Sequence, residues 1–345
     1  MEAALQRILI SDAELAPFGS VDALPRLASA LLRQQMQTWE LLRNNYASLD
    51  IVETKTFTFD GFVINVQFNP KRLTSSSAKV DDKSIRERRC FLCAANLPPE
   101  QRGFLYRDEY VFLCNPFPIL PEHFTIPNRE HRPQQIGESF EMFLQLAKDL
   151  AGDYTVIYNG PRAGASAPDH QHFQVGTRHV MPIDDEYQTL KHSKGELLVE
   201  SSALEAFSVE HYLRRLFILE AADGKILTRA FDLFLHAFME VTRAGEEPMM
   251  NLEAWYEDLG WRVAVFPRAK HRPSVFHAEG DRHMLLSPAA IDMGGICTTP
   301  LEKDFRKITK DNLVDMYDEV TLTAEAFAKI KNRMKEGLES VLHLR

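Results

Sequence analysis

The most distinctive stretch of the sequence runs from Ser166 to Gln174 and reads SAPDHQHFQ. Every second residue of a β-strand points to the same side. The pattern therefore predicts that His170, His172 and Gln174 share one face of a strand, about 6–7 Å apart, with Phe173 on the other face. Two imidazoles and an amide in a row suit a reactive site, and the alternative is a polar strand edge that faces solvent.

Length and composition set the frame for that motif. The chain has 345 residues, of which 45% are hydrophobic and 26% are charged, as in an ordinary globular protein of about two domains. The formal net charge is -9. An acidic chain is a poor general binder of nucleic acid, which requires a basic face. A small anionic ligand needs only a local basic pocket and is not excluded.

The cellular setting follows from the cysteines and the absence of targeting signals. Four cysteines are too few for a disulfide scaffold in a chain of this length. The N-terminal residues lack the pattern of a signal peptide, and no uncharged apolar run of about 18 residues occurs. We therefore expect no membrane span, a cytoplasmic location and reduced thiols.

Hydrophobic periodicity predicts an α+β fold with mainly antiparallel sheets flanked by helices. Helices are expected over residues 21–48, 134–151, 226–245 and 311–343, and hairpins over 54–70 and 250–268, with further strands in 109–127, 153–160 and 170–178. The basic, polar segment 71–89 is either a loop over a site or a flexible linker. Both parts of the chain contain strands and a long helix, so we expect two similar halves, residues 1–185 and 186–345.

A second motif, Cys90-Phe-Leu-Cys93, has the spacing of two zinc ligands. Two thiolates can bind one zinc ion at about 2.3 Å each, and a closed site needs two further ligands. His131 and His170 are available, with His123 as a rival. The alternatives are a redox pair, for which the surrounding βαβ context is missing, and two buried free thiols.

Together with the run NPFPILPEHFTIPNREH (residues 115–131), these motifs carry a family resemblance. The chain resembles the histidine-triad superfamily, in its branch of galactose-1-phosphate uridylyltransferases, dinucleoside tetraphosphate phosphorylases and GDP-hexose phosphorylases. The family motif H-x-H-x-Q matches His170, His172 and Gln174, and the preceding loop matches residues 164–166. The uridylyltransferase zinc set matches Cys90, Cys93, His131 and His170.

The resemblance implies that the catalytic residues lie in the first half and that the second half contributes substrate contacts. His172 would attack the α-phosphorus of a nucleotide sugar or dinucleoside polyphosphate and carry the nucleotide covalently. Gln174 and Ser166 would stabilise the charged oxygens, and a structural zinc would fix the strand. The acceptor would be phosphate or a sugar phosphate, because Gln174 stands where the hydrolase branch carries a third histidine.

Residues for substrate binding are expected from the need for cations and from the resemblance, since the family's strand ending in Asn-Asp-Phe, which contacts the nucleobase, is similar to residues 115–117. Guanidinium groups match phosphate oxygens, although any one basic residue also fits a solvated surface charge, and Phe117 also fits a core position. The expected substrate-binding residues are Arg72, Lys79, Asn115, Phe117, Asn159, Arg162, Arg268, Lys270 and Arg272.

Two departures from the family pattern leave the base and the sugar open. Gln171 replaces the proline of the uridylyltransferase H-P-H core, and Pro116 stands where an acidic residue is usual. A hydrolase of the same fold and a zinc-stabilised nucleotide-binding protein without catalysis remain the alternatives. Relatives are often dimers, so a homodimer is compatible with the resemblance.

Overall fold

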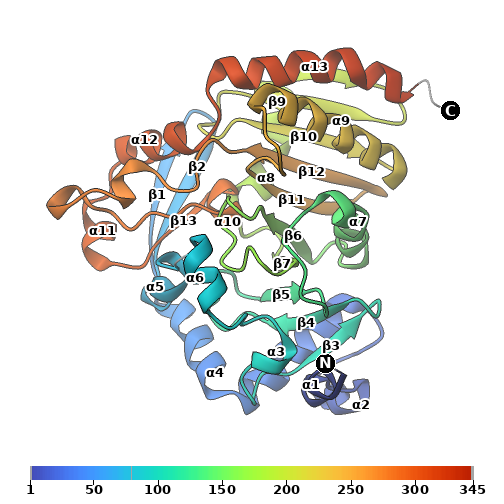
Figure 1. The fold of residues 1–345 in the computed structure, drawn as a ribbon, viewed down its shortest axis with the longest axis vertical. Coiled ribbons are helices and arrows are strands. Elements are labelled where there is room, and N and C mark those ends of the chain that lie inside the picture. The colour runs from blue at the N-terminus through green and yellow to red at the C-terminus, as the bar shows by residue number, and fades with distance from the viewer. Residues whose placement is uncertain (1, 79, 343–345) are drawn as a thin grey trace.

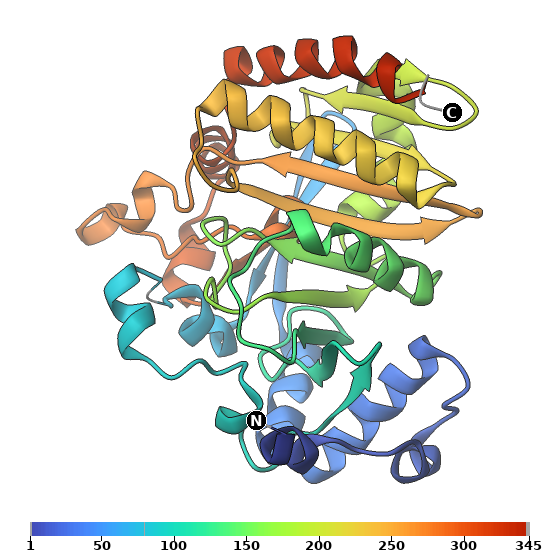
Figure 2. The same cartoon turned by 45° about the vertical axis from the view of Figure 1, so that its right-hand side comes forward.

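A ten-stranded antiparallel sheet runs through the centre of the fold (Figure 1, turned in Figure 2). The structure, a computed structural model, describes residues 2–78 and 80–342. In spatial order the strands are β3 (Gly103–Tyr106), β4 (Tyr110–Cys114), β5 (His123–Pro127), β7 (His172–Thr177), β6 (Tyr154–Asn159), β11 (Met250–Glu257), β12 (Gly260–Pro267), β10 (Leu216–Ala221), β9 (Glu205–Val209) and β8 (Gly195–Glu200).

The sheet consists of two halves with the same strand order. In the first half, β3, β4 and β5 are followed by a helix and then by β6 and β7, with β7 inserted beside β5. In the second half, β8, β9 and β10 are followed by a helix and then by β11 and β12, with β12 inserted beside β10. β6 pairs with β11, which joins the halves into one sheet. The predicted α+β fold with two similar halves is confirmed, and the predicted division at residue 185 falls inside a helix.

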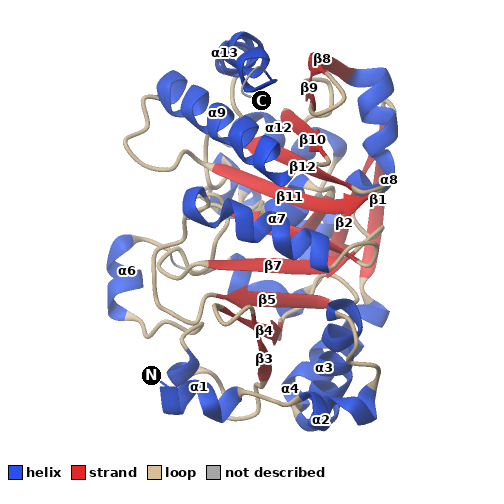
Figure 3. Ribbon diagram, turned by 90° about the vertical axis from the view of Figure 1, so that its right-hand side faces the viewer, coloured by secondary structure: helices blue, strands red, loops and turns tan. Residues whose placement is uncertain are grey.

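Helices cover one face of this sheet and extend past its β3 edge (Figure 3). On the face lie α7 (Phe140–Asp149), α9 (Gly224–Thr242) and α13 (Ala324–Leu342), and near β3 lie α1 (Glu2–Ile8), α2 (Asp12–Leu15), α3 (Leu24–Thr38) and α4 (Glu40–Ala47). The rings of Phe140 in α7 and Phe231 in α9 stack 3.9 Å apart, so the two halves share this core. Within the described ranges, no helix combines the length and apolar character needed to cross a membrane.

The opposite face carries a second, three-stranded sheet. It consists of β1 (Glu53–Phe59), β2 (Phe62–Phe68) and β13 (Ile296–Thr299), with α8 (Pro182–Thr189), α10 (Ala290–Met293), α11 (Glu302–Lys307) and α12 (Lys310–Val320) nearby, while α5 (Leu73–Ser76) and α6 (Asp82–Glu87) follow β2. β1 and β2 form the predicted hairpin, and Gly61 at its turn has a φ of +75° that favours glycine. β13 pairs in parallel with β2, so a strand from the second half completes the small sheet that the hairpin of the first half begins.

Two predicted helices are interrupted and one begins late. The helix expected over 21–48 breaks at Trp39, whose backbone is extended and whose side chain is buried. The helix expected from 311 breaks at Thr321, between α12 and α13, and its predicted end at 343 lies outside the described residues. The helix expected from 134 begins only at Phe140, because residues 134–136 bond elsewhere.

Glu247, in the loop before β11, ties the second half to the first. Its carboxylate accepts hydrogen bonds from the Tyr158 hydroxyl (2.6 Å) and from the Ile136 backbone N–H (2.6 Å). Burial raises the pKa of this carboxyl from 4.5 to about 7. The folded protein therefore holds this proton more tightly than the unfolded chain does.

We expect Glu247→Gln to remove a pH-dependent loss of stability. As pH rises from about 4.5 to about 7, the raised pKa makes the folded state lose stability relative to the unfolded chain, by up to about 3 kcal/mol. A glutamine keeps both hydrogen bonds, with the Tyr158 hydroxyl as acceptor. Urea unfolding at pH 5 and pH 8 measures the difference. Glu246→Gln, at the exposed neighbour, is the control, and an unchanged pH slope in Glu247→Gln would contradict the assignment.

Candidate active site

A cavity of about 460 Å³ lies between the first half of the large sheet, the segment after β2 and the α10 region. Eight of the predicted site residues line it: Arg72, Asn115, Phe117, Asn159, Ser166, His172, Gln174 and Arg272. Residues 74–76 and 78 also line it, so the segment after β2, which includes the short helix α5, lies over this cavity and is not a free linker. The cavity thus collects residues from both halves of the chain.

His172, the first residue of β7, presents a free ring nitrogen to the cavity. Its Nδ1 lies 2.7 Å from the carbonyl oxygen of His170 and donates a hydrogen bond to it. Burial lowers the pKa of the His172 imidazole to about 4, so the ring is neutral at pH 7. With Nδ1–H engaged, the lone pair sits on Nε2, which makes His172 a suitable nucleophile.

Gln174 is held by His123, which is not part of the metal cluster. His123 Nδ1 accepts a hydrogen bond from the Ile119 N–H (3.2 Å), so the proton of the neutral ring lies on Nε2. That Nε2–H donates to Gln174 Oε1 at 2.8 Å. The amide oxygen is therefore occupied, and the NH₂ group of Gln174 is left for the cavity that Gln174 lines. His123 lies diagonally across the β5–β7 pairing, which sequence spacing does not reveal.

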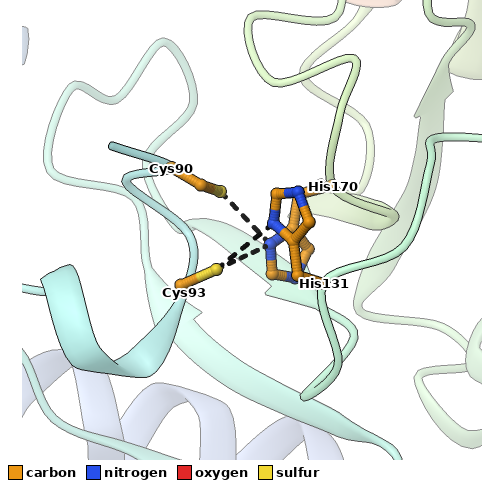
Figure 4. A group of neighbouring side chains, drawn as sticks. All are labelled: Cys90, Cys93, His131 and His170. Atoms are coloured by element: carbon orange, nitrogen blue, oxygen red, sulfur yellow. Dashed lines mark hydrogen bonds between the residues drawn. The ribbon is translucent and has the colours of Figure 1, made fainter. Parts of the chain in front are cut away.

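Cys90, Cys93, His131 and His170 converge on one point (Figure 4). Their four ligand atoms lie within 4.8 Å of one another. Three sulfur–nitrogen distances, between the thiols and the Nδ1 atoms of His131 and His170, are 3.3, 3.3 and 3.6 Å. A tetrahedral ion bound to sulfur at ~2.3 Å and to nitrogen at ~2.0 Å requires about 3.5 Å. The residues therefore fit a four-coordinate metal site.

Neighbouring groups orient the cluster and tie it to the cavity. His170 Nε2 lies 2.7 Å from the Asn128 carbonyl oxygen and donates to it, which directs Nδ1 at the thiols. Asp169 pairs with Arg88 at 2.5 Å. Arg88 also bonds to the carbonyl oxygen of Ser166 in the cavity wall at 3.4 Å.

The predicted common face of His170 and His172 is wrong. β7 begins at His172, and His170 lies in the preceding loop, where strand alternation does not apply. His170 faces the metal cluster, whereas His172 and Gln174 face the cavity. Phe173 packs into the core on the other side of β7, as predicted.

Several predicted cations lie outside the cavity. Arg268 is buried, and all five of its N–H groups donate, to Asn251 and to the carbonyls of residues 270, 271, 288 and 320, so none is left for substrate. Arg162 is exposed and bonds to the Glu247 carbonyl. Lys270 lines an open groove beside the cavity and pairs with Glu319. Lys79 lies outside the described residues.

The second half supplies one predicted cavity residue, Arg272, and others that the motifs did not indicate, among them Asp292. Arg272 donates to Ser287 and to the carbonyls of Ser76 and Ala78, and so holds the segment after β2 over the cavity. Asp292 in α10 also lines the cavity, and burial raises the pKa of its carboxyl to about 6. No spacing pattern in the sequence marks Asp292 as a site residue.

Comparisons with known proteins agree with this architecture. Residues 31–177 match a domain of unknown function, DUF4922, and residues 191–341 match the GDPGP1-like C-terminal domain. No curated protein sequence matches the chain.

The fold is shared with yeast Ap4A phosphorylase Apa2, which has been solved in several states. One crystal structure has a TM-score of 0.53 and 16% identity over 83% of this chain and 95% of Apa2. Its complex with AMP has a TM-score of 0.51 and 18% identity over 85% and 98%. The complex with Ap4A has a TM-score of 0.51 and 14% identity over 83% and 97%. The GDPGP1-like domain and the shared fold together support the resemblance to the histidine-triad superfamily, in its branch of galactose-1-phosphate uridylyltransferases, dinucleoside tetraphosphate phosphorylases and GDP-hexose phosphorylases.

Proposed function

We propose that this protein transfers a nucleotide from a nucleotide sugar or dinucleoside polyphosphate to phosphate or a sugar phosphate, through a covalent nucleotidyl-His172 intermediate. The observation that carries the proposal is the neutral His172 ring, whose Nε2 is left free beside the outward amide of Gln174. The GDPGP1-like domain and the fold shared with a phosphorylase support it.

The first step forms a bond between His172 Nε2 and the α-phosphorus. The bond from phosphorus to the bridging oxygen breaks, and that oxygen leaves with the electron pair on a sugar phosphate or a nucleotide. An acceptor phosphate oxygen then attacks the same phosphorus, and the electron pair returns to Nε2. The His172 Nδ1–H bond to the His170 carbonyl stabilises the positive charge that the ring gains.

Two neutral groups face the charge that shifts onto the phosphoryl oxygens. Gln174 offers its NH₂ group because His123 occupies its oxygen. Ser166 lines the same wall and offers a hydroxyl. Fixed donors of this kind need no reorganisation during the reaction, and removing one typically costs about 10²–10³ in rate.

Arginines supply the charge that phosphate groups need. Arg72 is half-buried, donates to the Phe117 carbonyl at 2.7 Å and has an unpaired Nε. Burial lowers the pKa of Arg72 only to about 10, so it stays charged at neutral pH. Arg272 lines the cavity from the other half. We assign both to the phosphates of the substrate.

Apolar side chains in the wall of the cavity suit a nucleobase. Trp39, Phe91, Leu97 and Phe117 line it together with Asn115. The Asn115 side-chain oxygen accepts from the Phe117 N–H at 2.9 Å, which holds the turn that presents the ring. Phe91 lies between the two cysteines of the cluster, so the metal loop forms part of this wall.

We assign zinc to the Cys90, Cys93, His131 and His170 cluster. With four protein ligands the ion would be structural, because no coordination position remains open for substrate. It would cross-link the loop at residues 90–93 to His131 and to the residues just before β7. The chemistry at phosphorus therefore falls to His172 and its neighbours.

Loss of His172 is expected to abolish the intermediate. Wild-type protein should acquire the mass of one nucleotide when mixed with UDP-, GDP- or ADP-hexoses or with dinucleoside polyphosphates, and should turn over when phosphate or a hexose 1-phosphate is added. His172→Ala should form no adduct, with His192→Ala, at an exposed histidine, as the control. Full turnover in His172→Ala refutes the mechanism. Equal rates with and without acceptor indicate a hydrolase, and nucleotide binding without turnover indicates a sensor.

Loss of His123 should slow nucleotide transfer, because His123 holds the side chain of Gln174 in place. We expect His123→Ala to lower kcat by roughly 10–100-fold, because the amide of Gln174 is then free to turn. In a Gln174→Ala background the same change should have little further effect, since the two residues act as one unit. Measured kcat values for the two single variants and the double variant test this coupling. Additive losses would show that His123 acts independently of Gln174.

Metal removal should lower the rate of His172 modification while the rest of the protein stays folded. Elemental analysis is expected to find about one zinc per chain, and Cys93→Ser should lose it. Cys114→Ser, which removes a buried thiol outside the cluster, is the matched control and should keep its zinc. The zinc assignment would be wrong if the wild-type protein held well under one metal ion per chain, or if Cys93→Ser kept a normal metal content. Neither result would contradict the role of His172.

A further inference from the structure

The segment Arg132–Ile136 crosses the point where β6 and β7 separate. The last pair of the β6–β7 ladder joins Ile157 to Gln174. Continued two residues further, this register would pair Asn159 with His172. The strands part there to admit the loop 160–171, whose residues form one wall of the cavity.

The side-chain amide of Gln134 bridges the gap between the two separated strands. Its oxygen accepts from the His172 backbone N–H at 2.7 Å. Its nitrogen donates to the carbonyl oxygens of Asn159 at 2.9 Å and of His172 at 3.0 Å. One carboxamide thus supplies the donor and the acceptor that the missing strand pair would have provided.

Gln171 fastens the same segment to the start of β7. Its backbone N–H donates to the Arg132 carbonyl at 2.7 Å, and its side-chain oxygen accepts from the Gln135 N–H at 2.9 Å. The Gln134 N–H donates to the Pro168 carbonyl at 3.1 Å. A proline at position 171, as in the uridylyltransferase pattern, would make neither of the Gln171 bonds.

From this geometry we propose that Gln134 is a positioning residue, which sets the aim of the His172 ring by holding the backbone of His172 against that of Asn159. Gln134 is 1% exposed and does not line the cavity, so it acts only through these two residues. The ring of His172 is tied to the backbone by its bond to the His170 carbonyl. Any shift of this backbone therefore moves Nε2. The proposal rests on the proposed role of His172 as nucleophile.

The effect on rate should be large because bond formation at phosphorus depends on geometry. A displacement of about 1 Å at a reacting atom can cost on the order of 10²-fold in rate. The residues assigned to the nucleobase and the phosphates, such as Phe117 and Arg72, lie on other segments of the chain, so their contacts should remain. A positioning role therefore predicts a fall in kcat with little change in nucleotide affinity.

Gln134→Glu tests the bridge with almost no change of shape. A carboxylate still accepts from the His172 N–H, but it cannot donate to the two carbonyl oxygens and repels them. We expect the rate of nucleotidyl-His172 formation to fall about 100-fold, with the Kd of the donor nucleotide changed less than threefold. Gln35→Glu is the matched control, because Gln35 is also a buried amide that bonds to backbone, at Arg102, and does not line the cavity. It should lose stability without a selective loss of rate.

Gln171→Pro is the second variant and introduces no charge. It removes the bonds to Arg132 and Gln135 and should lower the same rate, again with nucleotide affinity kept. If Gln134→Glu does not fold, Gln171→Pro decides the question. A folded variant with a rate within twofold of wild type, or a loss no greater than that of Gln35→Glu, overturns the proposal.

Amide hydrogen exchange of the peptide spanning residues 159–174 gives a readout that needs no substrate. Exchange at the His172 N–H should be faster in Gln134→Glu than in wild type and in Gln35→Glu. Unchanged exchange overturns the bridge. If wild-type protein forms no adduct with any donor, the proposed function fails, and the exchange result still shows whether Gln134 holds the start of β7.

Discussion

The hydrogen bonds around His170 fix the start of β7, and the geometry of the site depends on that point. The two ring nitrogens of His170 face the thiols on one side and the Asn128 carbonyl on the other. The backbone carbonyl of His170 accepts a hydrogen bond from His172 Nδ1–H. The side chain of one residue therefore serves the metal cluster, and its backbone orients the neighbouring imidazole. Because Nδ1 of His172 is committed, only Nε2 can face the cavity. His170 therefore connects the metal cluster to the ring of His172, although the two face different sites.

Sequence spacing predicted the parts of the site that depend on local chemistry. Two thiols three residues apart and two histidines suffice to indicate a metal site, and the Asp60-Gly61 turn suffices to indicate a hairpin, because each constraint lies within a short segment. The shared face of His170 and His172 was not predicted correctly, since strand alternation holds only once β7 has begun. The boundary depends on bonds to residues about 40 positions away.

The same limit explains the late start of α7 and the role of Arg268. Ile136 continues the apolar periodicity of the helix, but Gln134 bonds to His172 in β7 and Gln135 to Gln171 just before it. These bonds hold the segment out of the helix. Tertiary contacts of this kind override helix propensity. Arg268 carries the charge expected of a phosphate ligand, yet its donors bond to the C-terminal end of α12 and to the segment before α10. Residue type alone does not distinguish a ligand-binding arginine from a structural one.

The two halves share a strand order, but only the first opens between its last two strands to form a wall of the cavity. Between β6 and β7 the chain makes the loop 160–171, which opens the strands and forms a cavity wall. At the equivalent place between β11 and β12 it makes a tight turn at Asp258 and Leu259, and the ladder closes to Glu257 and Gly260. The second half contributes instead a covering wall. Because β6 and β11 pair directly and β13 pairs with β2, that wall is fixed to the half that carries His172.

The amide at position 174 also restricts which leaving groups the proposed reaction can use. A carboxamide donates hydrogen bonds but cannot release a proton at neutral pH, unlike an imidazolium. His123 is neutral, because burial lowers its pKa to about 3, and its Nε2–H is engaged by Gln174. These two residues therefore leave the departing oxygen without a proton donor. Such a site favours leaving groups that are stable as anions, such as sugar phosphates and nucleotides, over alcohols or amines that must be protonated as they depart.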